Sequence, residues 1–291
     1  MRYKSMLVVT ILALLLAVFF GSGGLAVAGE QISPGAEVSG VDAPGEDAFW
    51  AGPVWNGFNE LLGRAVCDGL VDYALLAREA AKLDAFLALL ATARPEGMSR
   101  EQSLAFHIDL YNAATLRLIL TKYPDLKSIK DLGSWFERPW SIEFVDYARG
   151  KVSLDFIERE VLRRRFADPR IHFALNCSAR SCPPLRAELY FPERIDEQLD
   201  DACRTYVNNP EAVFVREGEL FVSKIFRWYA DDFEQGAEAF VRHWAGPELL
   251  RQMDEAMEGA GGAGKLRVRY LSYDWSLNDL ARVPAGSGVA P

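Results

Sequence analysis

The pattern of apolar side chains along the chain predicts mostly helices. Leu76, Leu83, Leu87 and Leu90 recur at near-helical spacing, and the run ends before Pro95. This spacing predicts an amphipathic helix over that stretch. No internal repeat is visible in the sequence.

The longest predicted helix follows directly. Ser99 and Gln102 have the spacing of a capping box, and Tyr123-Pro124 predicts that the helix ends at about Lys122. The segment between them, SLAFHIDLYNAATLRLIL, is apolar almost all round. A helix of this kind is expected to be the central buried helix of the fold.

The remaining pattern adds a few short strands to further helices. The predicted elements are a helix from Ser153 to about Arg165, a strand at 171–176, a helix at 194–208, a hairpin at 212–223 turning at Glu217-Gly218-Glu219, a helix from about Asp232 to Met257, and a strand at 266–273. We therefore expect an α+β fold, a mainly helical single domain with a small, mostly antiparallel sheet, over residues 48–280.

The first 28 residues have the features of a secretory signal peptide. Arg2 and Lys4 precede an apolar run from Leu7 to Phe20, and the triplet at 26–28 is Ala-Val-Ala. The alternative is an uncleaved anchor, but the glycines at 21–24 interrupt the roughly 20 apolar residues that a span needs. We expect cleavage after residue 28 and an extracytoplasmic location, which is the periplasm if the source is bacterial.

Composition and charge restrict the partners of the mature chain. Half of the 291 residues are hydrophobic, which excludes a disordered chain. Loss of Arg2 and Lys4 changes the net charge from −9 to −11, and this acidity argues against nucleic-acid binding. No second stretch approaches membrane-spanning length, so no stable span is expected after cleavage. Residues 29–47 and 281–291 are expected to be a mobile leader and a disordered tail.

Export changes how the four cysteines are interpreted. Cys67, Cys177, Cys182 and Cys203 are an even number, which favours disulfides in an oxidising compartment. Four cysteines allow three complete pairings, and the sequence does not choose among them. The fold must still depend on its core, because four cysteines are few for a chain of this length.

Five segments occur in an order that resembles a known family. They are AFHIDLYNA (105–113), SLDFIERE (153–160), PRIHFALNCSARSCPPL (169–185), SKIFRWYADDF (223–233) and YDWSLND (273–279). Together they resemble the domain-of-unknown-function 547 (DUF547) family over roughly residues 60–280. The resemblance implies no settled activity. The chain departs from the family pattern at His107, Asp109 and Arg159, where the family usually has Trp, Asn and His.

The segment from His172 to Pro184 is the densest group of candidate catalytic residues. A cysteine nucleophile needs a base, usually a histidine, and a group that orients the base. If the chain stays extended, His172 and Cys177 are about 16 Å apart, so Cys182 is the better partner for His172 and Cys177 would need His107 or His243. The alternatives are a Cys177–Cys182 disulfide that closes the turn, or inert thiols.

Two further segments supply candidate residues. Asp109 and Asn112 share a face of the central helix and either bond to loop backbone or line a cleft. His107 is expected to be partly exposed. Asp274 lies between two aromatic residues and either orients a histidine or arginine, or caps the turn after it. We expect His172, Cys177, Cys182, Asn112 and Asp274 to surround one concavity.

Other charged groups have simpler interpretations. Glu158 lies early in a capped helix, where the helix dipole favours an acid. The arginines at 159, 163, 164, 165 and 170 are expected to form a solvated face with local ion pairs. With only three histidines, none at metal-binding spacing, and no Gly-rich phosphate loop, no metal or cofactor is expected.

Two functions from different classes remain. The first is an exported binding or structural module of the cell envelope, with a disulfide-stapled turn and an unknown protein or polymer as its partner. The second is a cysteine-dependent hydrolase or acyl-transferase that uses a Cys/His site. A thiol–disulfide exchanger is a weaker third, because four residues rather than two separate Cys177 from Cys182.

Overall fold

A computed structural model describes residues 46–134, 137–148, 150–259 and 265–283. Helices dominate these residues and the strands are short, so the predicted α+β, mainly helical fold is confirmed. Within the described ranges, no helix is both long and apolar enough to cross a membrane. The predicted signal peptide, most of the leader, residues 260–264 and most of the tail lie outside the described residues.

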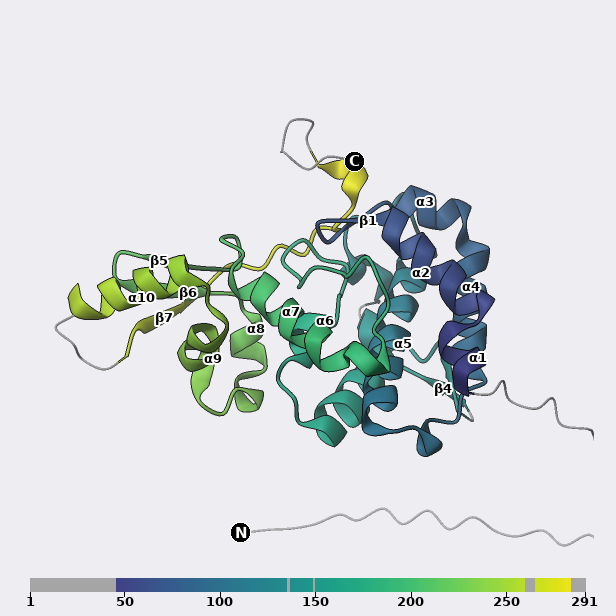
Figure 1. The fold of residues 1–291 in the computed structure, drawn as a ribbon. Coiled ribbons are helices and arrows are strands. Elements are labelled where there is room, and N and C mark those ends of the chain that lie inside the picture. The colour runs from purple at the N-terminus through teal and green to yellow at the C-terminus, as the bar shows by residue number, and fades with distance from the viewer. Residues whose placement is uncertain (1–45, 135–136, 149, 260–264, 284–291) are drawn as a thin grey trace, which may run out of the picture. The chain divides into compact units, whose positions relative to one another are not determined.

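The N-terminal helices pack around one long helix. They are α1 (Glu46–Ala51), α2 (Pro53–Ala65), α3 (Tyr73–Arg78), α4 (Ala80–Ala91) and α5 (Arg100–Leu120). The helix expected around Leu76 to Leu90 is thus two helices that meet at Glu79. α2 contacts α4, and α4 contacts α5 (Figure 1).

The prediction for the central helix is confirmed. The Ser99 hydroxyl accepts a hydrogen bond from the Gln102 N–H (3.1 Å), and the Gln102 side chain accepts one from the Ser99 N–H (2.9 Å). Nearly every side chain from Ser103 to Ile119 is buried. His107 is fully buried as well, so the expectation of partial exposure is wrong. Its imidazole is satisfied internally, by the Ser103 carbonyl and the Tyr147 hydroxyl.

Three small sheets supply the β structure. The pairs β1 (Val66–Cys67) with β2 (Leu70–Val71) and β3 (Val145–Tyr147) with β4 (Gly150–Val152) are antiparallel. The third sheet has the order β5 (Val213–Arg216), β6 (Glu219–Val222), β7 (Arg267–Tyr270). β5 and β6 form the predicted hairpin, and β7 adds to β6 in parallel. Glu217 and Gly218 take positive φ at the turn, as a tight hairpin requires.

A second apolar cluster joins this sheet to the later helices. These are α7 (Ile195–Val207), α8 (Ile225–Trp228), α9 (Gly236–Trp244) and α10 (Pro247–Gly259). The predicted helix at 194–208 is therefore confirmed. The helix expected from Asp232 to Met257 is divided between α9 and α10, because Pro247 cannot continue α9 and instead begins α10. Short 3₁₀ turns occur at Pro95–Gly97, Ile129–Leu132, Pro139–Ser141, Pro192–Arg194, Ala230–Asp232 and Leu280–Arg282.

The strand expected at 171–176 is wrong. The segment forms one helical turn, α6 (Ile171–Ala174), which packs against α7 (Figure 1). A short apolar run that is buried on all sides has no periodicity to separate strand from helix. The Asp168 carboxylate accepts the Arg170 N–H (3.0 Å), which begins the turn locally. The coiled backbone shortens the path from His172 to Cys177 relative to an extended strand.

The helix predicted after Ser153 is present, with an unusual winding. The Ser153 hydroxyl accepts the Phe156 N–H (3.2 Å), and residues Phe156–Phe166 are wound as a π-helix, η4. It ends at Ala167, whose φ is +50°. η4 contacts α5 and carries Glu158 and Arg163 toward the candidate site. π-helical turns are uncommon and occur often at functional sites.

Candidate functional site

Two thiols meet in the turn that follows α6. The Cys177 and Cys182 sulfurs are 2.7 Å apart, and the Cys177 N–H lies 2.8 Å from the Cys182 sulfur. Both cysteines are free thiols, so the expected disulfide staple is not present in this structure. Cys203 is a buried free thiol on α7.

The C-terminal segment holds this turn in place. The Arg180 N–H donates to the Ser276 carbonyl (2.9 Å), and the Ser181 N–H donates to the Asp274 carbonyl (3.2 Å). In return, the Asp274 N–H donates to the Ser181 hydroxyl (2.9 Å). Tyr206 of α7 donates to the Ser181 carbonyl (3.0 Å). The two thiols therefore lie on a turn that is fixed from two sides.

Asn112 fixes the backbone between His172 and the thiols. Its amide donates to the Ala174 carbonyl (3.0 Å), and its oxygen accepts the Asn176 N–H (2.9 Å). Asn176 in turn donates to the Pro183 carbonyl (2.7 Å) and accepts the Ser178 N–H (2.8 Å). Asn112 thus has the loop-backbone partners that were one of its two predicted alternatives.

Asp109, the other polar residue on this face of α5, also binds backbone. Its buried carboxylate accepts the Tyr190 N–H, with oxygens at 3.1 and 3.2 Å. Burial raises the pKa of Asp109 well above its ordinary value, and the hydrogen bond from Tyr190 offsets part of this effect. Asp109 therefore anchors a loop away from the thiols.

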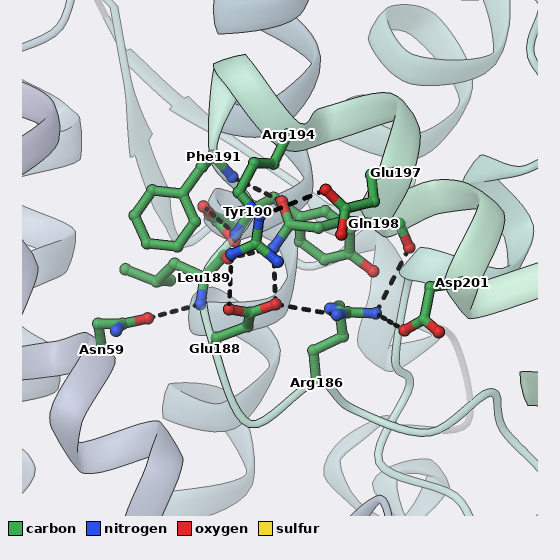
Figure 2. A network of polar contacts seen from close by, with 11 residues as sticks. Asn59, Arg186, Glu188, Leu189, Tyr190, Phe191, Arg194, Glu197, Gln198 and Asp201 are labelled. Carbon is green, nitrogen blue, oxygen red and sulfur yellow. Dashed lines mark hydrogen bonds and ion pairs between the residues drawn. The ribbon is translucent and has the colours of Figure 1, made fainter.

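The same loop has further polar anchors (Figure 2). The Asn59 side chain of α2 accepts the Leu189 N–H (2.8 Å), and Gln198 of α7 accepts the Phe191 N–H (2.8 Å). Arg186 forms ion pairs with carboxylates on both sides of it, as Figure 2 shows. The chain that leaves the thiol turn is therefore attached to α2, α5 and α7.

The environments of the two thiols differ in electrostatics. A hydrogen bond from Cys182 lowers the pKa of Cys177, and the Tyr273 hydroxyl and the Ala179 N–H add to this effect against the cost of burial. Burial raises the pKa of Cys182 well above its ordinary value, and the adjacent Cys177 raises it further. Cys177 is therefore the more acidic thiol of the pair and forms a thiolate more readily than Cys182.

His172 has an acidic partner that the sequence analysis did not identify. Its Nε2 atom lies 2.6 Å from Asp232 Oδ2, and Arg163 binds both oxygens of Asp232 (2.6 and 2.9 Å). The hydrogen bond with His172, then the one from Arg163, lowers the pKa of Asp232. The Tyr229 ring stacks on the imidazole with centroids 3.9 Å apart. His172 is thus oriented from two sides.

Asp274 does not orient His172 in this structure. Its carboxylate accepts the Ser276 N–H (2.9 Å), and hydrogen bonds from the Ser276 hydroxyl and then from this N–H lower the pKa of Asp274. This is the turn-capping alternative for that residue. Neither Asp274 nor Asn112 is among the residues that line the pocket beside the thiols.

The thiols and His172 line one cavity of about 550 Å³. Its other walls are formed by Leu175 and Pro183 near the thiols and by five further stretches of the chain: Tyr111; Arg138 and Trp140; Asp155, Glu158, Arg159 and Arg163; Ile225, Trp228, Tyr229 and Asp231; and Tyr273 and Trp275. The cavity therefore brings together three of the five predicted site residues. His107 and His243 do not line it.

The sequence pattern alone did not predict that four further residues contribute to the site: Arg163, Tyr229, Asp232 and Tyr273. Tyr229, Asp232 and Tyr273 lie in two of the five segments singled out in the sequence, at 223–233 and 273–279. The order of those segments was thus a usable signal. Arg163 was interpreted as part of a solvated basic face, and only the tertiary structure places it against Asp232.

Comparison with known proteins identifies one match. No curated protein and no solved structure matches the chain. Residues 95–207 match the model of one family, described as a protein of unknown function. The matched segment contains α5, η4, α6 and the thiol turn. Over residues 95–207, the resemblance to the DUF547 family is therefore confirmed.

Proposed function

We propose that the cavity is the active site of a cysteine-dependent hydrolase or acyl-transferase, with Cys177 as the nucleophile. The observation that carries this proposal is that a thiolate-forming cysteine and a carboxylate-anchored histidine line the same cavity. Nucleophile, base and orienting acid are the three groups that such chemistry needs. Asp232 takes the orienting role that was one of the two alternatives for Asp274.

The reaction has two steps. The Cys177 thiolate attacks the carbonyl carbon of an acyl group, a C–S bond forms, and the bond to the leaving group breaks. The leaving group takes its proton from the His172 imidazolium, which the Asp232 carboxylate stabilises. Water, or a second nucleophile, then gives a proton to His172 and attacks the thioester. This releases the acid or the transferred acyl product and regenerates the thiolate.

An acylation experiment tests the proposal without knowledge of the natural substrate. The reduced protein is mixed with 4-nitrophenyl acetate, and 4-nitrophenol release is followed while mass spectrometry locates the acetyl group. We expect a thioester at Cys177 that then hydrolyses. Cys177→Ala should abolish the thioester, whereas Cys67→Ala, which removes a thiol outside the cavity, should leave it unchanged. Acetylation that is no faster than in the urea-unfolded chain would rule out the proposal.

The binding or structural module is the second candidate. The contact of 2.7 Å between the sulfurs supports it, because little movement is needed to join them in an oxidising compartment. In that case the stapled turn would present the cavity as a binding site for an envelope protein or polymer. A thiol count on the native protein separates the candidates: a Cys177–Cys182 disulfide that forms on isolation and resists mild reductants favours the module.

Export is the location that we propose for either function. The support is the N-terminal sequence alone: Arg2 and Lys4, the apolar run to Phe20, and the Ala-Val-Ala triplet at 26–28. N-terminal sequencing of protein from the extracytoplasmic fraction should begin at Gly29. A chain that retains Met1 in a membrane fraction would contradict cleavage.

A further inference from the structure

One wall of the cavity is an aromatic cluster. Trp228, Tyr273 and Trp275 contact one another with ring centroids 4.6–5.6 Å apart. Trp228 is 46% exposed, although a buried environment would suit an indole better. Its ring therefore offers an open aromatic surface to a ligand in the cavity.

This cluster already holds a cation. The Lys130 ammonium lies 4.0 Å from the centroid of the Trp275 ring, within the range of a cation–π contact. Lys130 itself does not line the cavity. The contact shows that the face of an indole in this cluster attracts an ammonium group.

The charged residues of the cavity differ in how they are compensated. Arg163 pairs with Asp232 (2.6 Å), and Arg138 and Arg159 both pair with Asp155 (2.8 and 3.6 Å). Glu158 and Asp231 also line the cavity, and no ion pair is formed by either within the described residues.

Burial decides which of these charges acts most strongly inside the cavity. Arg138 and Arg159 carry one net positive charge with Asp155, but their side chains are 63% and 52% exposed, so solvent and salt screen them. Glu158 is only 7% exposed, lines the cavity and accepts a hydrogen bond from the Tyr229 hydroxyl. The charge of Glu158 also acts on Arg163, but Arg163 forms its ion pair with Asp232, so the buried Glu158 carboxylate can still attract a cation.

We propose that the cavity binds a protonated amine, with Glu158 and Asp231 as its counter-charges and the open face of Trp228 as its aromatic contact. This inference rests on the proposed role of Cys177 and names its substrate class. The substrate is an acyl compound that carries an ammonium group near the acyl carbon that Cys177 attacks. An amide of a diamino acid, or of a peptide with a free amine, has this chemistry.

Thiosulfonate reagents of opposite charge test this directly. The Cys177 thiolate attacks the reagent sulfur, a disulfide forms, and methanesulfinate leaves. The trimethylammonium-ethyl and sulfonato-ethyl methanethiosulfonates share this reactive group. Their rates at Cys177 are compared in a Cys182→Ser background, which prevents a second exchange and keeps a hydroxyl donor. The ratio of the two rates is divided by the same ratio for the urea-unfolded chain.

We expect the folded protein to favour the cationic reagent by about tenfold, since one buried charge acts over a few ångströms. Glu158→Gln should remove most of this preference, and Asp231→Asn a smaller part. Glu160→Gln is the matched control, because it removes an acid of the same helix that is exposed and paired with Arg164. Added salt should reduce the preference only partly, because Glu158 is buried.

Two results would overturn the inference: a rate ratio no higher than that of the unfolded chain, or a preference that Glu158→Gln leaves unchanged. The experiment is independent of catalysis. A protein that forms the acetyl thioester without any cation preference keeps the proposed function and loses this substrate class. A protein with the preference that forms no thioester loses the proposed function instead.

Discussion

Helix α5 and the cavity each hold a histidine and an acid, but the two sets of residues have different partners. His107 contacts the Ser103 carbonyl and the Tyr147 hydroxyl, and Asp109 binds the Tyr190 N–H. His172 and Asp232 bind each other, and the imidazole borders an open cavity. Both histidines are buried.

The comparison shows that burial and a shifted pKa do not identify a site by themselves. Burial lowers the pKa of His107 to about 4 and raises that of Asp109. The hydrogen bonds of both side chains nevertheless go to other groups within the folded core and not to a cavity. At His172, the partner acid orients a ring that lines the same cavity as the two thiols. Access to a cavity, together with a paired acid, is what distinguishes His172 from His107.

The largest expected effect is the loss of the folded state, and it tests whether helix α5 has a purely structural role. Leu116 is 2% exposed in the core, so Leu116→Asp would bury an unpaired charge and should unfold the protein. Near-UV circular dichroism at room temperature measures this. Ala88→Asp, at an exposed position of α4, is the control and should remain folded. A folded Leu116→Asp variant would show that α5 is peripheral.

The next effect concerns the cavity side. His172→Gln should slow acetylation of Cys177 by a factor of about 10²–10⁴, the usual contribution of a general base. The thermal midpoint of His172→Gln should fall by less than that of His107→Gln, because the His172 ring borders a cavity. His107→Gln should give the opposite pattern, with a lower midpoint and a normal acetylation rate. Equal rate losses in the two variants would erase the distinction between the histidines.

The pH dependence of stability sharpens the comparison further. The folded protein keeps His107 neutral to about pH 4, whereas the unfolded chain binds a proton below about pH 6.5. The contribution of neutral His107 to the free energy of unfolding is therefore fully present above pH 6.5. It is lost as the pH falls toward 4, by about 3 kcal/mol in total.

Urea unfolding at pH 7 and pH 4.5 measures this loss. His107→Gln does not titrate, so its stability should fall less over that interval than the wild-type stability. The lowered pKa of Asp232 contributes little here, because its stabilisation is lost only as the pH falls below the ordinary range of an aspartate. Parallel losses in the two proteins would contradict the assignment to His107.

The smallest effect separates two roles of Asp109. Asp109→Ala leaves the buried Tyr190 N–H without an acceptor and should lower the free energy of unfolding by about 1–3 kcal/mol. Asp109→Asn keeps an acceptor and removes a charge whose burial is costly, so it should be at least as stable as the wild type at pH 7. Urea unfolding of both variants measures this difference. A more stable alanine variant would contradict the hydrogen-bond role.

Local signals in the sequence predicted most of the fold. The capping box of α5, the turn residues of the β5–β6 hairpin and the amphipathic pattern of α7 each act within a few residues, so they are readable without tertiary structure. The prediction failed at 171–176, where an apolar run is buried on all sides and Asn112 binds the backbone from another helix. That contact joins positions far apart in the chain.

The site was predictable only in the part whose residues lie close together in the sequence. His172, Cys177 and Cys182 are close in sequence, so their segment was identifiable. The acid that orients His172 comes from the turn at Ala230–Asp232, and the arginine that holds this acid comes from η4. An acidic residue in a turn and an arginine in a basic run have nothing locally that distinguishes them from surface charges.

The aromatic wall has a consequence for the timing of synthesis. Tyr273 and Trp275 lie close to the C-terminal end of the described chain, and the segment that contains them also holds the thiol turn through the Ser276 and Asp274 carbonyls. A nascent chain that has emerged only as far as α10 already contains both thiols and His172, but it lacks the hydroxyl and the backbone that shape their surroundings. A chain that ends after α10 would therefore contain the cysteines and His172 without the segment that holds the thiol turn and forms the aromatic wall.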